Sequence, residues 1–316
     1  MRRRTFARLA GLCYLLAQAL GSSSLADEPA ALAPRPPKFV RIDRDADRNP
    51  LTLQTAVVHY VPQDSTQGPL EVDLVGAVHV GERSYYEALN KLFTQYDVVL
   101  YELVAPEGTR IPKGGRSSGH PVALLQNGMK DALNLEHQMQ CVDYTGDNMV
   151  HADMSPDEFA KSMSDRGESW AGTLFRMMGA GIAQQSKRQA QGKSPEVDFL
   201  SALFSDDRAG AMKRFMAEQF DDVDSVMAAL EGPQGSTLIS ERNKVALEKL
   251  REQIAAGKKK IAVFYGAGHL ADMEQRLFKD FQLKRAGEEW LTAWNLAALQ
   301  EPPANGAKTP AASDSK

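Results

Sequence analysis

The sequence predicts an α/β fold: a central mixed sheet with flanking helices and a long helical insertion between two similar halves. Each half contains a strand, the motif Gly-Ala-x-His and a helix, with the motif at residues 76–79 in the first half and 266–269 in the second. Between them, residues 156–256 have apolar residues at the spacing typical of helices. Since strand–helix–strand units stand at both ends, we expect the C-terminal part to complete the sheet that the N-terminal part begins.

The first 26 residues have the features of a signal peptide. Four arginines precede an apolar run at 9–20, and small residues at 24–26 suit cleavage by a signal peptidase. The run is shorter than the ~20 residues that span a bilayer. We therefore expect cleavage, an exported protein that is periplasmic or secreted, and no stable membrane span after signal removal. The pair Arg3-Arg4 leaves general secretion and twin-arginine export both open.

Composition narrows the function classes. With 316 residues, 43% hydrophobic and 25% charged, the chain is typical of globular proteins. Signal removal takes away four arginines and no acidic residue, so the formal charge falls from −4 to −8, which argues against a nucleic-acid partner. The chain has neither H-E-x-x-H nor C-x-x-C, so it belongs to neither the common zinc-protease nor the zinc-finger class.

Pro/Ala-rich segments flank the predicted domain. Residues 27–38 are expected to form a disordered linker, and residues 301–316 a disordered tail. A single domain is expected at 39–300, with the helical insertion at about 105–240.

The strands and helices of this domain follow from local patterns. A strand or hairpin is expected at 39–62, and the β-favouring residues Val72, Leu74 and Val75 then precede the first motif. After that motif, Tyr85, Leu89, Leu92 and Tyr96 recur at helical spacing.

The remaining elements continue the pattern. DVVLYELV (97–104) and QCVDYT (140–145) predict two more strands. SPDEF (155–159) begins a helix, with serine at the N-cap, proline at the first helical position and Glu158 three residues after the cap. The last strand is expected near 281–286.

Three residues indicate one shared site. His79 and His269 stand at the carboxyl ends of the two motif strands, which is the edge where open α/β sheets bind ligands, and imidazole is the commonest metal ligand. Glu102 ends a predicted interior strand, where a carboxylate is costly unless it pairs or binds a cation. The alternatives are structural: histidines satisfied by backbone hydrogen bonds, and a glutamate that reaches solvent.

Four further residues are candidates. His151 and Asp153 come just before the capped helix, so either could face the same edge, or Asp153 could simply stabilise the helix N-terminus through the helix dipole. Arg242 and Asn243 lie in the helical stretch SERNKVALEKL (240–250), and charge runs on helices usually form solvent-exposed faces.

Together, GAVH (76–79), YEL (101–103), ERN (241–243) and YGAGHL (265–270) resemble the TraB/GumN family, which is related to the Tiki metalloproteases and more distantly to erythromycin esterases. The resemblance covers about residues 70–285. It implies an α/β core with a helical insertion and, in the Tiki branch, a peptidase dependent on a divalent metal. By position, His79, Glu102 and His269 would be the metal-binding residues, and Arg242 the recurrent arginine of the family.

These observations lead to one main hypothesis and two alternatives. The main one is an exported hydrolase of a peptide or related amide or ester bond, dependent on manganese, cobalt or zinc, in which the metal activates water and Arg242 stabilises an oxyanion or holds a substrate carboxylate. Glu102 is either a ligand or the general base. The alternatives are a non-enzymatic protein that binds or sequesters peptide signals, and a metal-free hydrolase of acyl or ester bonds with a histidine base.

Overall fold

The computed structural model describes residues 38–114, 133–190, 200–202, 204–220, 227, 230–232 and 234–297. The chain divides into two compact units, Met1–Pro36 and Pro37–Lys316, and all described residues belong to the second. The predicted signal peptide, residues 27–37 of the linker, and the tail lie outside the described residues.

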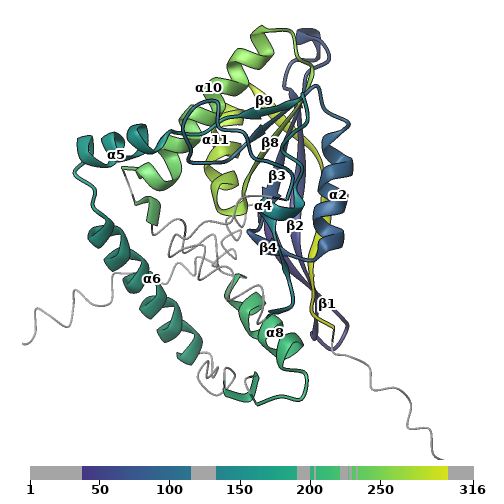
Figure 1. Cartoon of the computed structure of the whole chain (residues 1–316), viewed down its shortest axis with the longest axis vertical. Helices are drawn as coiled ribbons and strands as arrows, with labels where there is room; N and C mark the ends of the chain where they lie inside the picture. Colours follow the sequence, from purple (N-terminus) through teal and green to yellow (C-terminus); the bar gives the residue numbers. More distant parts are fainter. Residues whose placement is uncertain are drawn as a thin grey trace, which may run out of the picture. The chain divides into compact units, whose positions relative to one another are not determined.

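The described strands form one mixed sheet and a small separate pair (Figure 1). The main sheet comprises β1 (Val40–Arg44), β2 (Pro50–Pro62), β3 (Glu71–Ala77), β5 (Val98–Tyr101), β7 (Met149–His151), β8 (Lys260–Gly266) and β9 (Leu283–Asn295). Its order is β1-β2-β3-β8-β5-β7, and β9 also pairs with β2. Strands β3, β8, β5 and β7 run parallel, whereas β2 is antiparallel to β1, β3 and β9. The predicted α/β class with a central mixed sheet is confirmed.

Strand β8, from the second half of the chain, lies between β3 and β5 of the first half. In the parallel register, Gly76 of β3 is opposite Tyr265 of β8, and Ala77 is opposite Gly266. The two Gly-Ala-x-His motifs therefore leave the sheet side by side at the same edge. The repeat alone suggests a shared site. The structure provides it because β8 pairs directly with β3.

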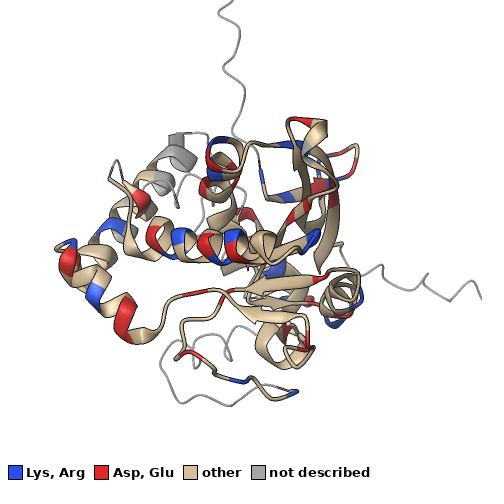
Figure 2. Cartoon of the chain, turned by 90° about the horizontal axis from the view of Figure 1, so that it is seen from above, with Lys and Arg blue, Asp and Glu red and all other residues tan. Residues whose placement is uncertain are grey.

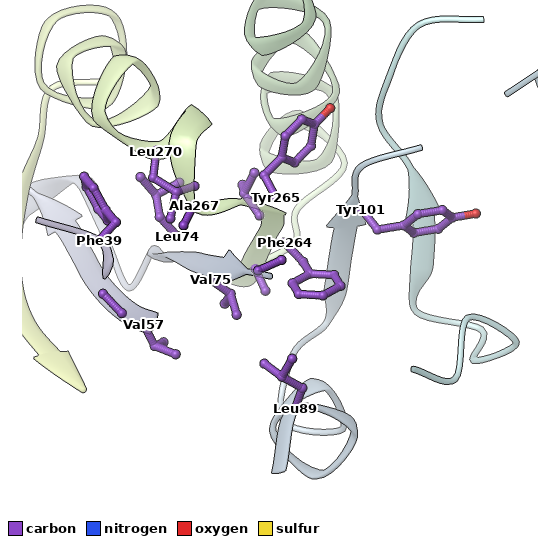
Figure 3. Packing of buried hydrophobic residues seen from close by; sticks show 14 of the residues in the cluster. Phe39, Val57, Leu74, Val75, Leu89, Tyr101, Phe264, Tyr265, Ala267 and Leu270 are labelled. Atoms are coloured by element: carbon purple, nitrogen blue, oxygen red, sulfur yellow. The ribbon is translucent and has the colours of Figure 1, made fainter. Parts of the chain in front are cut away.

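Helices cover both faces of the sheet. Three of the helices packed against it are α2 (Arg83–Phe93), α10 (Arg242–Ala255) and α11 (Leu270–Asp280). Figure 3 shows Val75 and Phe264 on the same side as Leu89 of α2, whereas Leu74 lies on the other side with Leu270 of α11. These side chains are almost completely buried, and burial of each such residue contributes roughly 1.5–3 kcal/mol of transfer free energy.

The insertion between β5 and β8 contains more than helices. Its described elements are β6 (Glu136–His137), α4 (Gln138–Cys141), β7, α5 (Pro156–Asp165), α6 (Trp170–Ala190), α8 (Arg208–Phe220) and a π-helical turn, η2 (Thr237–Glu241). Strand β6 pairs with β4 (Val80–Gly81). Short 3₁₀ turns occur at η1 (Ser65–Gln67) and η3 (Ala267–His269). The insertion thus supplies the outermost parallel strand, β7, as well as the predicted helices.

Two local predictions differ from the structure. Residues 140–145 do not form a strand; α4 ends at Cys141, and the side chain of Asn90 accepts from the amide of Asp143 and donates to the carbonyl of Cys141. The Asn90 side chain of α2 thus makes the backbone hydrogen bonds that a neighbouring strand would make if residues 140–145 were a strand. The last strand begins at Leu283 and runs to Asn295, well beyond the predicted end, because β2 pairs with it along almost its whole length. The predicted hairpin at 39–62 is confirmed as β1–β2.

Charged side chains are interspersed by sign over the described elements (Figure 2). On α10, for example, Lys249 pairs with Glu252 and Arg251 with Glu248. Among the described helices, none combines the length and the apolar character needed to cross a bilayer.

Candidate functional site

Glu102 is the centre of the site. It follows β5 directly, and its amide still donates to the carbonyl of Phe264 on β8 (3.1 Å). Its Oε2 accepts from the amide of Gly266 at 2.6 Å, and its Oε1 accepts from Arg242 Nη2 at 2.6 Å. A Cβ on Gly266 would lie 3.2 Å from Oε2, so the glycine allows the carboxylate to approach the backbone this closely.

The carboxyl group of Glu102 is held in its ionised form. Burial by itself would raise its pKa, but the electrostatic interactions with His269, Arg242 and His79, together with the hydrogen bond from the Gly266 amide, lower it to about 2. A group that acidic is a poor proton acceptor near neutrality. Of the two roles left open by the sequence, ligand or general base, this environment favours binding a cationic group.

Arg242 is that cationic group in the structure. It stands where η2 passes into α10, and its side chain is only 8% exposed. Its Nε and Nη2 donate to the two carboxylate oxygens of Asp153 at 2.9 and 2.6 Å, while Nη2 also reaches Glu102. Burial would lower the pKa of Arg242, but its hydrogen bonds to Asp153 and the charge of Glu102 raise it. One buried cation therefore links two buried carboxylates.

The solvent-exposed face expected for this charge run is present, but Arg242 is not part of it. Lys244, Lys249 and Arg251 form exposed pairs with nearby glutamates on α10. Arg242 instead points inward, because the insertion brings Asp153 to the same place from a distant part of the chain.

His269 is neutral and has one defined tautomer. Asn243 Nδ2 donates to the His269 carbonyl (3.1 Å) and to Asp272 Oδ2 (2.8 Å), so its Oδ1 is the oxygen that faces His269 Nδ1 at 2.7 Å. Nδ1 therefore carries the proton. Burial and the charge of Arg242 lower the pKa of His269, whereas the charge of Glu102 raises it, and the net shift is downward.

The unprotonated nitrogen of His269 is Nε2, which accepts a long hydrogen bond from Arg242. This atom lies 3.5 Å from Arg242 Nη1 and 3.6 Å from Glu102 Oε1. A neutral imidazole with a fixed tautomer can accept a proton or bind a cation through this nitrogen.

The other predicted residues separate into two groups. His79 is exposed and close enough for its charge to act on Glu102, while its carbonyl accepts from the amide of Gln138 (2.9 Å). His151 instead directs Nε2 to the carbonyl of Leu103 (2.5 Å) and packs near Tyr101. The structure thus brings His79, Glu102, Asp153, Arg242, Asn243 and His269 together, whereas His151 contacts Leu103 and Tyr101, the neighbours of Glu102 in the chain.

Sequence reasoning missed the role of the acid that follows each motif histidine by three residues. In the second copy, Asp272 accepts from Asn243 and so supports His269; in the first, Glu82 accepts from Lys213 Nζ of α8 at 2.6 Å. The repeated spacing was the signal that could have identified both acids.

The described part of the insertion contacts the same edge of the sheet. Helix α8 packs against β1, and Arg44 of β1 pairs with Glu218 of α8. Next to His269, a Cβ built on Gly268 would lie only 2.8 Å from Met227 Cγ. Two described segments of the insertion, α8 and Met227, therefore lie close to β1 and to Gly268.

Comparisons of the chain with protein-family models, with curated proteins and with solved structures found no match.

Proposed function

We propose that the protein is an exported hydrolase of a peptide or related amide or ester bond, with His79, Glu102, Arg242 and His269 at its reaction centre. The observation that carries the proposal is the neutral imidazole of His269, whose unprotonated Nε2 accepts a long hydrogen bond (3.5 Å) from a buried arginine. A proton acceptor next to a fixed positive charge is what hydrolysis of a carbonyl compound requires. The resemblance to TraB/GumN proteins supports the same reaction class.

The roles follow from the contacts. His269 Nε2 accepts a proton from the attacking water, and Asn243 keeps the ring in the required tautomer. Arg242 stabilises the negative charge that develops on the carbonyl oxygen. Asp153 and Glu102 hold the guanidinium in position before substrate arrives. His79, which is exposed, contacts the substrate or the leaving group.

The expected divalent metal does not fit the donor atoms as they stand. The guanidinium of Arg242 lies 2.6 Å from Glu102 Oε1 and 3.5 Å from His269 Nε2, so a cation already occupies the position between these two ligands. Among the described residues, no group of three or more histidine, cysteine, aspartate or glutamate side chains could hold a metal ion. Binding of manganese, cobalt or zinc by His79, Glu102 and His269 would require Arg242 to move, and it stays a prediction.

The experiment is an activity screen of the mature chain, residues 27–316, against a peptide library and p-nitrophenyl esters. Each substrate is tested after chelator treatment and again with manganese, cobalt or zinc added, and metal content is measured. His269→Ala and Glu102→Gln should each lower kcat by at least about 100-fold. Glu252→Gln, on the exposed face of α10, is the matched control and should retain wild-type kcat.

The outcomes separate the hypotheses. Activity that survives chelation supports the histidine-base mechanism, and activity restored only by a metal supports the predicted metal-dependent form. Peptide binding without turnover identifies a peptide-binding protein and overturns the hydrolase proposal.

A further inference from the structure

A second candidate site lies at the opposite end of the parallel strands from Glu102. The register of β3 and β8 begins with Glu71 opposite Lys260 and ends at the two motifs. At the beginning of this register is a pocket of about 460 Å³, within the size range of roughly 300–1,000 Å³ that is typical of small-molecule sites. Its polar lining includes His59, Glu71, Asp73, Tyr96, Lys260 and Glu289.

A buried carboxylate orients the histidine of this pocket. Asp73 is only 3% exposed and lies directly across from His59 in the β2–β3 register. Its Oδ1 is 2.9 Å from His59 Nδ1, and its Oδ2 accepts from the hydroxyl of Tyr96 at 2.5 Å. Burial and the charge of Asp73 both raise the pKa of Tyr96, so its hydroxyl remains a donor. This contact holds the His59 ring in a defined orientation at the wall of the pocket.

The remaining polar groups make the pocket rich in acceptors. His59 Nε2 is 3.9 Å from Glu289 Oε1, and Lys260 Nζ is 4.0 Å from Glu71 Oε2, so neither contact is within ordinary hydrogen-bond distance. The carboxylates of Glu71 and Glu289 outnumber the single ammonium of Lys260. Tyr96 adds an aromatic face, over which Lys260 Nζ already lies at 5.5 Å from the ring centroid.

From this geometry we infer that the pocket is a binding site for a small organic cation that carries a guanidinium or primary ammonium group. The cation donates to the carboxylates of Glu71 and Glu289, which both line the pocket. Its alkyl part packs against Tyr96 and Leu92, which also line the pocket. The inference is independent of the proposed hydrolysis, since the pocket shares no lining residue with the reaction centre.

Isothermal titration calorimetry on the mature chain tests this inference, with n-butylguanidinium as the probe and the neutral n-butylurea as its matched analogue. The guanidinium should bind at one site per chain, and the urea should not. The double variant Glu71→Gln/Glu289→Gln should bind the probe at least about tenfold more weakly. Glu288→Gln is the control, because Glu288 is the next residue on β9 but pairs with Arg285 outside the pocket lining.

Circular dichroism and the thermal midpoint establish that the variants are folded; if the double variant does not fold, Glu289→Gln alone is used, because Glu289 is 67% exposed. Equal binding of the urea, no binding of the guanidinium, or binding that is as tight in the pocket variant as in Glu288→Gln would each overturn the inference.

Discussion

Asn243 determines which nitrogen of His269 carries a proton, although the sequence marks it only as a neighbour of Arg242. Because Asp272 and the His269 carbonyl occupy the amide nitrogen of Asn243, its oxygen can only accept from His269. This orientation depends on residues of α10, α11 and the turn η3, and no local pattern reveals it.

We expect Asn243→Ala to lower kcat of the proposed reaction by about 10- to 100-fold, because the imidazole loses the partner that fixes its tautomer. The measurement is steady-state kinetics with circular dichroism as a check of folding. Asn49→Ala is the matched control, since Asn49 is exposed and its side chain bonds to Asp45. A wild-type kcat for Asn243→Ala would show that the contact is not needed.

Gly266 is the second residue whose role the structure defines. In Gly266→Ala the new methyl group would lie 3.2 Å from Glu102 Oε2, so this carboxylate must shift by a few tenths of an ångström, whereas the His269 ring at 3.7 Å is in ordinary van der Waals contact. A displacement of roughly 1 Å in a catalytic site costs about 100-fold, so we expect this smaller shift to lower activity by about 10-fold.

Gly179→Ala is the control for this substitution, because a Cβ at that position of α6 meets nothing within 4 Å. Alanine there should be neutral or stabilising by up to about 1 kcal/mol. Full activity of Gly266→Ala would mean that the close approach of Glu102 to the backbone has no role in the reaction.

At the scale of elements, the helix that begins after Asp153 is the one whose start the sequence predicts best. Ser155 accepts from the amide of Glu158, and the Glu158 side chain accepts from the amide of Ser155, so the predicted capping box is confirmed. These contacts join residues three positions apart, which is why they could be predicted locally.

Ser155→Ala should lower the free energy of unfolding by about 1 kcal/mol, since the amide of Glu158 loses the hydroxyl that accepts its hydrogen bond. Urea denaturation measures the change. Ser164→Ala, at an exposed position inside the same helix, should change stability little because alanine is the better helix former. Equal effects of the two substitutions would contradict a specific role for the cap.

Strands were predicted less well than this helix, for a physical reason. The apolar alternation of residues 140–145 satisfies the strand pattern, yet Asn90 occupies the backbone groups that a neighbouring strand would need. Conversely, the exposed and charged positions of β9 obscure a strand that β2 stabilises by pairing. A strand depends on a partner from elsewhere in the chain, whereas a helix satisfies most of its hydrogen bonds within itself.

For the molecule as a whole, the predicted signal peptide leads to a prediction about cleavage. We expect residues 1–26 to be absent from the exported protein, which should begin at Asp27. Ala26→Trp should block cleavage, because a signal peptidase needs a small residue at this position, whereas Ala30→Trp should not. N-terminal sequencing checks both, and an exported wild-type protein that begins at Met1 would disprove the prediction.

The sequence by itself determined the α/β class, the hairpin, the capped helix and the two repeated motifs, because each depends on periodicity or on contacts between residues close in the chain. Only the tertiary structure decided that β8 lies between β3 and β5, that Arg242 turns inward to join Asp153 and Glu102, and that Asp73 orients His59 at the other end of the strands. These arrangements join segments far apart in the sequence. A buried charge needs a partner of opposite charge, and the fold can supply that partner from any part of the chain. The spacing of residues along the sequence does not show which distant residues come into contact.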